Sequence, residues 1–160
     1  MSWRKISVLY ALLVGASIAT ASQARAESLK VLTEEFPPYN YTENAKITGF
    51  STEVVQAVLK EVKIQGEFQS MPWARAYETA QSADNVLIYS IGRTPQREKL
   101  FKWVGVIAPT QYYLFSLPQR KLKFDRLDQA RSFQIATVNE DVGEQFLMAR
   151  GFAKGINLQS

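Results

Sequence analysis

The sequence predicts an α/β protein with a parallel sheet, and two features carry that prediction. Residues 29–32, 66–70 and 86–91 have the pattern of short strands, and helical segments separate them. The run at 86–91, Val-Leu-Ile-Tyr-Ser-Ile, has the β-branched, apolar character of a strand buried on both faces. Two β-α units that lead into a third strand favour a parallel sheet with right-handed crossovers.

The first 26 residues predict a secretory signal peptide. Arg4 and Lys5 form a short basic region, residues 6–21 are almost uninterruptedly apolar, and residues 24–26 form an A-x-A cleavage site. We expect cleavage after Ala26, a periplasmic location and no retained membrane anchor. Removal of Arg4, Lys5 and Arg25 with this segment lowers the number of Lys and Arg residues from 19 to 16, while the 15 Asp and Glu residues remain. The formal charge therefore falls from +4 to +1.

Composition excludes several classes of function. The chain contains no cysteine and no histidine, so disulfides, thiol chemistry and imidazole catalysis are all excluded. We expect no metal and no cofactor. The basic residues are scattered, and this argues against nucleic acid as a partner.

The first strand leads into a loop at residues 33–41. Pro37 and Pro38 forbid a helix there, so the loop must run extended over the surface. A helix is expected over 51–62, with Ser51 as its N-cap. Its apolar positions are spaced as one buried stripe, formed by Val54, Val55, Val58, Leu59 and Val62.

A second helix is expected to open at 71–77, with a proline near its first turn. Ligands of parallel sheets lie beyond the carboxyl ends of the strands. This rule brings residues 34–39, 73–77 and 90–97 to the same edge.

The stretch at 85–103 is the most informative part of the sequence for the prediction of a binding site. After the buried strand and Gly92, Thr94 and Pro95 have the form of a helix N-cap followed by proline at the first helical position. Arg97 would lie in that first turn. A guanidinium and free backbone N–H groups at one point suit an anion, most simply a carboxylate.

The pattern changes after residue 109. Residues 112–117 are strand-like, 118–128 form a basic polar connector, and 133–138 begin a second sheet. Asp141 is the expected cap of a helix that runs to about residue 150 and stops at Gly151.

The run S-x-G-R-T-P-x-R-E-K-x-F-x-W-V-G at 90–105 resembles the central motif of the family 3 solute-binding proteins, the periplasmic receptors of amino-acid-type ABC transporters. The P-P-Y element at 37–39 and the G-F-S-T-E-V element at 49–54 also match, and P-W-x-R-A-Y resembles a subgroup signature. The resemblance implies a type II periplasmic-binding-protein-like fold. Residues 27–108 would form the first segment of lobe 1, and this lobe would be nearly complete. Residues 109–160 would form the hinge and the start of a truncated lobe 2.

By the same resemblance, Ser90 and Arg97 would hold the α-carboxylate of the ligand. The alternative for Arg97 is a surface residue paired with a nearby acid. The ring of Tyr39 would cover the ligand, and Glu34 or Glu35 would meet a cationic group. For each glutamate the alternative is simple exposure to solvent.

Two further candidates lie in the P-W-x-R-A-Y element. Trp73 would stack on a ligand, and Arg75 would reach an anionic group. Trp73 and Tyr77 lie four residues apart, so an apolar pair on the helix is the competing interpretation.

Asp141 marks a departure from the resembled family. Glu140 and Asp141 stand where amino-acid binders place a small Gly-Ser or Gly-Thr pair that helps to hold the carboxylate. Two acids there would repel a carboxylate. Either the ligand offers this lobe a cationic or hydroxyl group, or it is not a standard amino acid.

The resemblance therefore implies a monomeric periplasmic solute-binding protein of an ABC importer, without enzymatic activity and partnered by a permease. It would bind a small polar, amino-acid-like solute in a cleft between lobes. One alternative is a dehydratase-type enzyme on the same scaffold with Glu34 or Glu35 as general acid. Another is an extracytoplasmic sensing domain.

Overall fold

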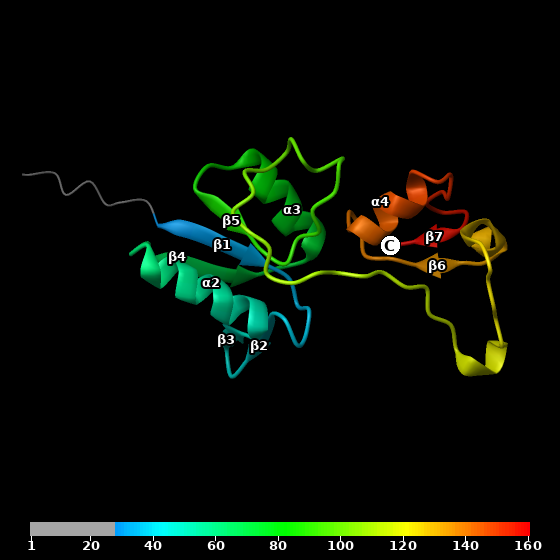
Figure 1. Ribbon diagram of the computed structural model, residues 1–160, viewed down its shortest axis with the longest axis horizontal. Helices are drawn as coiled ribbons and strands as arrows, with labels where there is room; N and C mark the ends of the chain where they lie inside the picture. The colour runs from blue at the N-terminus through cyan, green and yellow to red at the C-terminus, as the bar shows by residue number, and fades with distance from the viewer. Residues whose placement is uncertain (1–27) are drawn as a thin grey trace, which may run out of the picture.

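The computed structural model describes residues 28–160, and the predicted signal peptide lies outside that range. Two lobes are joined by an extended segment (Figure 1). The first lobe holds a parallel sheet in the order β4-β1-β5. Its strands are β1 (Leu29–Thr33), β4 (Gly66–Ser70) and β5 (Val86–Ile88). The predicted parallel sheet is confirmed, although β5 is shorter than the apolar run at 86–91.

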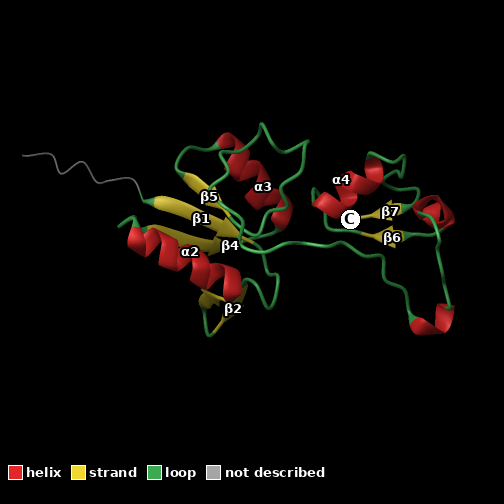
Figure 2. Ribbon diagram, viewed as in Figure 1, coloured by secondary structure: helices red, strands yellow, loops and turns green. Residues whose placement is uncertain are grey.

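Helices α2 (Phe50–Glu61) and α3 (Trp73–Ser82) flank this sheet on opposite sides (Figures 1 and 2). Alternate residues of a strand face opposite sides, and Val31 of β1 packs against Val55 and Leu59 of α2. Trp73 is buried at the start of α3, which contacts β1 and β5. The carboxyl ends of the strands therefore meet the amino-terminal end of α3.

The first helix begins earlier than predicted. Gly49 is the residue before α2, and Ser51 lies buried inside the first turn. Gly49 has a φ of 105°, and a Cβ at that position would lie 2.6 Å from the carbonyl oxygen of Tyr39. Only glycine tolerates both conditions, so the backbone at Gly49 fixes where the helix starts.

A short hairpin that the sequence did not reveal precedes α2. Strands β2 (Tyr41–Glu43) and β3 (Lys46–Thr48) pair in antiparallel fashion. Asn44 and Ala45, which connect them, both have positive φ. This is the conformation of the two-residue turns that favour hairpins.

The segment between the lobes is not the strand expected at 112–117. Residues 102–117 contain no helix or strand, and Phe115 is 90% exposed. No strand within residues 28–160 pairs with this segment, so its apolar residues gain no ladder hydrogen bonds.

The second lobe contains the 3-10 helices η1 (Pro118–Arg120) and η2 (Leu127–Ser132), strand β6 (Ile135–Ala136), helix α4 (Val142–Met148) and strand β7 (Leu158–Gln159). Strands β6 and β7 are parallel, and β6 is shorter than the predicted 133–138. Asp141 caps α4 as predicted, since its Oδ2 accepts a hydrogen bond from Gly143 N at 3.1 Å. Among residues 28–160, no helix combines the length and apolar character that a membrane crossing requires.

Candidate functional site

Arg97 is delivered by a series of turns beyond β5. The predicted helix at Thr94-Pro95 is wrong, because residues 95–100 form turns. Arg97 N donates to the carbonyl of Thr94 at 3.0 Å and lies 3.3 Å from its hydroxyl, so Thr94 caps a single turn. The local arrangement still directs Arg97 inward, and its side chain is only 1% exposed.

The guanidinium of Arg97 lies between the two lobes. Its Nη2 donates to the carbonyl of Glu140 at 2.8 Å and its Nε to Gln145 Oε1 at 3.1 Å, both in the second lobe. On the first lobe it lies 4.7 Å from the ring centroid of Tyr77 and 5.7 Å from that of Trp73. Arg97 is therefore an interlobe residue, and the interpretation as a surface residue is wrong.

Trp73 belongs to the same cluster. Its ring stacks on Tyr77 with centroids 5.8 Å apart, as the packing interpretation requires. Its Nε1 also donates across the lobe boundary to the carbonyl of Glu140 at 3.0 Å. Trp73 therefore combines a packing role with a polar contact to the second lobe. A hollow of about 630 Å³ adjoins this contact, lined in part by Tyr77, Glu140 and Gln145.

Ser90 faces a buried polar network in the first lobe. Its backbone is left-handed (φ 57°), and its hydroxyl donates to Asn40 Oδ1 at 2.5 Å. Asn40 is fully buried and donates from Nδ2 to the carbonyl of Glu34 at 2.7 Å. Asn40 thus links the loop after β1 to the end of β5 and fixes both where they meet.

The carboxyl groups of Glu34 and Asp141 and the hydroxyl of Tyr112 approach the same region from both lobes and the connecting segment. Burial, with a smaller contribution from Asp141, raises the pKa of Glu34 from 4.5 to about 7. Burial also raises the pKa of the Tyr112 hydroxyl; Asp141 and Glu34 raise it further, whereas Arg97 lowers it. Glu34, Asp141 and Arg97 therefore all act electrostatically on Tyr112, and Asp141 also acts on Glu34.

Glu35 has a different position. Its carboxylate is exposed and accepts hydrogen bonds from Ser70 Oγ at 2.5 Å and from Thr42 N and Oγ1 at 2.8 and 2.7 Å. The Ser70 and Thr42 contacts lower the pKa of Glu35. Glu35 therefore ties the loop after β1 to the hairpin and to the end of β4.

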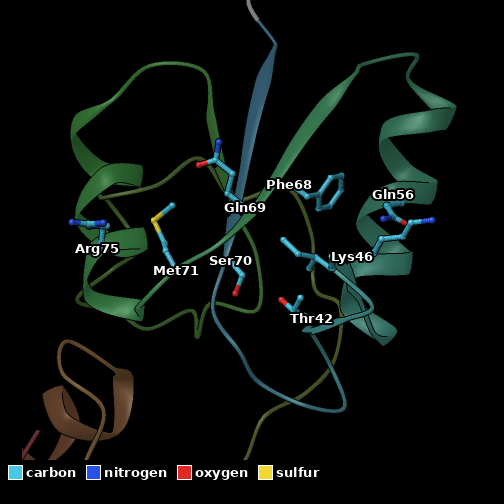
Figure 3. A pocket seen from close by; sticks show the side chains of 10 residues that line it. Thr42, Lys46, Gln56, Phe68, Gln69, Ser70, Met71 and Arg75 are labelled. Carbon is cyan, nitrogen blue, oxygen red and sulfur yellow. The ribbon is translucent and has the colours of Figure 1, made fainter.

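Arg75 also lies apart from the Arg97 cluster. It is exposed and lines an open groove of about 760 Å³ beside the edge strand β4, and Lys46 and Ser70 line other parts of the same groove (Figure 3). Tyr39 is 38% exposed and stacks on Phe36 with centroids 5.3 Å apart. Ligand contact by Tyr39, Glu35 and Arg75 stays a prediction.

Asn40, Tyr112 and Gln145 are the residues of this region that the sequence interpretation missed. Gln145 follows Asp141 by four positions, a spacing that places both on one face of a helix, so periodicity gave a usable signal. For Asn40 and Tyr112 no local pattern exists, because their roles depend on contacts with distant segments. Among residues 28–160, no group of acidic side chains is arranged to hold a metal ion.

Two α/β lobes joined by an extended segment, with polar side chains meeting between them, define the architecture of a periplasmic binding protein. A family model described as bacterial extracellular solute-binding proteins, family 3, matches residues 29–126. The match covers more than half of the chain, and the chain belongs to this family.

Solved structures agree on the fold. An ancestral arginine-binding protein bound to arginine superposes with a TM-score of 0.61 at 20% identity, covering 82% of this chain and 59% of that one. A histidine kinase sensor domain with similarity to periplasmic binding proteins superposes with a TM-score of 0.64 at 16% identity, covering 83% of this chain and 58% of that one. The arginine-, lysine-, histidine-binding protein ArtJ from Geobacillus stearothermophilus superposes with a TM-score of 0.60 at 18% identity, covering 83% of this chain and 57% of that one.

The chain therefore spans less than two thirds of the length of each of these structures. At such identities the likeness concerns the fold alone. A comparison with curated proteins finds no match.

Proposed function

We propose that the protein captures a small, amino-acid-like solute between its lobes in the periplasm and passes it to the permease of an ABC importer. The observation that carries this proposal is the position of Arg97. Its guanidinium is buried between the lobes, and no acidic side chain among residues 28–160 lies within salt-bridge distance of it. A buried guanidinium of this kind is suited to the carboxylate of a solute, which would supply the negatively charged partner that no described residue provides within salt-bridge distance.

The acids near Arg97 support a solute that also carries a positive group. Glu34 and Asp141 approach the region from different lobes, and the pKa of Glu34 is raised mainly by burial and further by repulsion from Asp141. An ammonium or guanidinium group placed between them would relieve that repulsion. The ligands of the solved relatives, arginine for one and arginine, lysine and histidine for another, agree with a zwitterionic or basic solute.

Thermal melting of the full-length protein with a panel of amino acids and small organic acids tests this proposal. A solute at one hundred times its dissociation constant adds about 2.7 kcal/mol to the free energy of unfolding. We expect a basic or zwitterionic carboxylate to raise the midpoint and its decarboxylated amine to have no effect. If the amine raises the midpoint as much as the acid, the role of Arg97 is refuted.

A sensing domain is the second candidate function, because a histidine kinase sensor domain shares the fold. Reconstitution with the cognate permease separates the two functions. A transport receptor stimulates ATP hydrolysis by the ATPase subunits that are assembled with the permease when its solute is bound, whereas a sensor leaves the rate unchanged. An enzyme would need Glu34 as its acid, since hydrogen bonds from Ser70 and Thr42 keep the pKa of Glu35 low.

A further inference from the structure

The carbonyl oxygen of Glu140 is the meeting point of three N–H donors. From the first lobe, Arg97 Nη2 donates at 2.8 Å and Trp73 Nε1 at 3.0 Å. From the second lobe, Gln145 Nε2 donates at 3.3 Å. A carbonyl oxygen has two lone pairs, so three donors exceed what a neutral acceptor satisfies in the usual way. The donor set is better matched to an oxygen that carries negative charge.

This set of donors is held firmly. Arg97 and Trp73 are 1% and 3% exposed, and Arg97 packs over the Tyr77 ring. Gln145 contacts both partners, because its Oε1 accepts from Arg97 Nε at 3.1 Å while its Nε2 donates at 3.3 Å both to the Glu140 carbonyl and to the Glu140 side-chain Oε2. The backbone of Glu140 adopts a left-handed conformation (φ 61°), which is uncommon for a residue other than glycine. The donors thus define one oxygen position, and a strained residue fills it.

We propose that the Glu140 carbonyl is an internal substitute for the carboxylate oxygen of the solute and holds the lobes together before solute binds. The inference rests on the proposed function. A carboxylate accepts stronger, charge-assisted hydrogen bonds from a guanidinium than a carbonyl does, so an incoming solute displaces the carbonyl. Trp73 and Gln145 then become carboxylate-binding residues together with Arg97.

Distance measurements between spin labels test this inference without any solute. The chain has no cysteine of its own, so Lys60→Cys on α2 and Met148→Cys on α4 give one labelled site in each lobe of the full-length protein. We expect a main population at short distance. Trp73→Phe keeps the aromatic ring and removes the Nε1 donor. Loss of one hydrogen bond of typical net strength lowers the ratio of closed to open protein about fivefold.

Trp103→Phe is the matched control. The Trp103 Nε1 donates to the carbonyl of Glu98 at 3.2 Å, a contact within the first lobe. This variant removes the same chemical group without touching the interface, and its distances should equal those of the parent. Gln145→Leu provides a second interface variant with the same expected opening, so the test does not depend on Trp73 alone.

Two results would overturn the inference. The first is a parent protein that is already open and whose label distances do not change in Trp73→Phe or Gln145→Leu. The second is an equal degree of opening in Trp73→Phe and Trp103→Phe. Since no solute is added, these outcomes are independent of the melting experiment. A protein that closes through Glu140 but responds to no carboxylate would refute the proposed function instead.

Discussion

Replacing Arg97 with methionine measures how strongly the two lobes depend on one buried guanidinium. The change removes the hydrogen bonds to the Glu140 carbonyl and the Gln145 amide, at 2.8 and 3.1 Å, and a longer one to the Gly92 carbonyl at 3.4 Å. Each of the two shorter bonds has a charged donor and contributes about 1.5–3 kcal/mol. Methionine retains contact with the aromatic rings and avoids the cost of desolvating a charge. We therefore expect a net loss of about 3 kcal/mol in the free energy of unfolding.

Urea denaturation followed by tryptophan fluorescence measures that loss, and Arg93→Met is the matched control. Arg93 also lies over an aromatic ring, that of Trp103, and it pairs with Glu98 at 2.5 Å, but both partners of the pair are about half exposed. Surface pairs of this kind contribute little, so the control should unfold like the parent. A loss below about 1 kcal/mol for Arg97→Met, or equal losses in both variants, would refute the account of the interface.

Two further predictions concern the loop after β1 and the start of α2. Because the pKa of Glu34 is raised from 4.5 to about 7 in the fold, its contribution to stability is complete below pH 4.5 and declines as the pH rises to 7. Urea midpoints measured from pH 4 to 8 report this fall in stability with rising pH. Glu34→Gln should remove the pH dependence and Asp141→Asn should reduce it. An unchanged pH dependence in Glu34→Gln would contradict its assignment to Glu34. Gly49→Ala places a Cβ 2.6 Å from the Tyr39 carbonyl at a positive φ and should cost about 2 kcal/mol or more, whereas Gly105→Ala, with open space around it, should be neutral. Thermal melts compare the two, and a neutral Gly49→Ala would contradict the predicted clash.

Local periodicity was enough to predict the sheet and the helices that flank it. The strand at 66–70 and the helix that opens at Trp73 follow from the alternation of apolar runs and turn residues. Asp141 was recognisable as a cap because an acid that precedes a helical segment has one dominant structural use. In each case the information lies within a few residues of the element itself.

The elements that were predicted wrongly depend on distant parts of the chain. Thr94 and Pro95 have the pattern of a helix start, but the chain forms turns there, and the Arg97 side chain points inward and contacts the second lobe. The apolar run at 112–117 has strand composition, and a strand also needs a neighbour to pair with. Composition alone does not supply that neighbour.

The candidate site was predicted in its residue types but only in part in its contacts. Arg97 and Trp73 were identified as candidates, and the structure brings them together between the lobes. The Glu140 carbonyl could not be found from the sequence, because every residue carries a carbonyl and only the fold selects one. Asn40 likewise gains its role from burial beside Ser90, across fifty residues of sequence.

Calorimetric titration of the full-length protein with the solute that raises its melting midpoint tests whether Arg97 binds the carboxylate of that solute. Arg97→Lys keeps the charge and loses the forked geometry that a carboxylate prefers, and Arg93→Lys makes the same change on the surface. We expect one bound solute per chain and an affinity that falls at least about tenfold in Arg97→Lys, equivalent to about 1.4 kcal/mol, and is unchanged in Arg93→Lys. An Arg97→Lys variant that binds the solute as tightly as the parent would contradict a site built on Arg97.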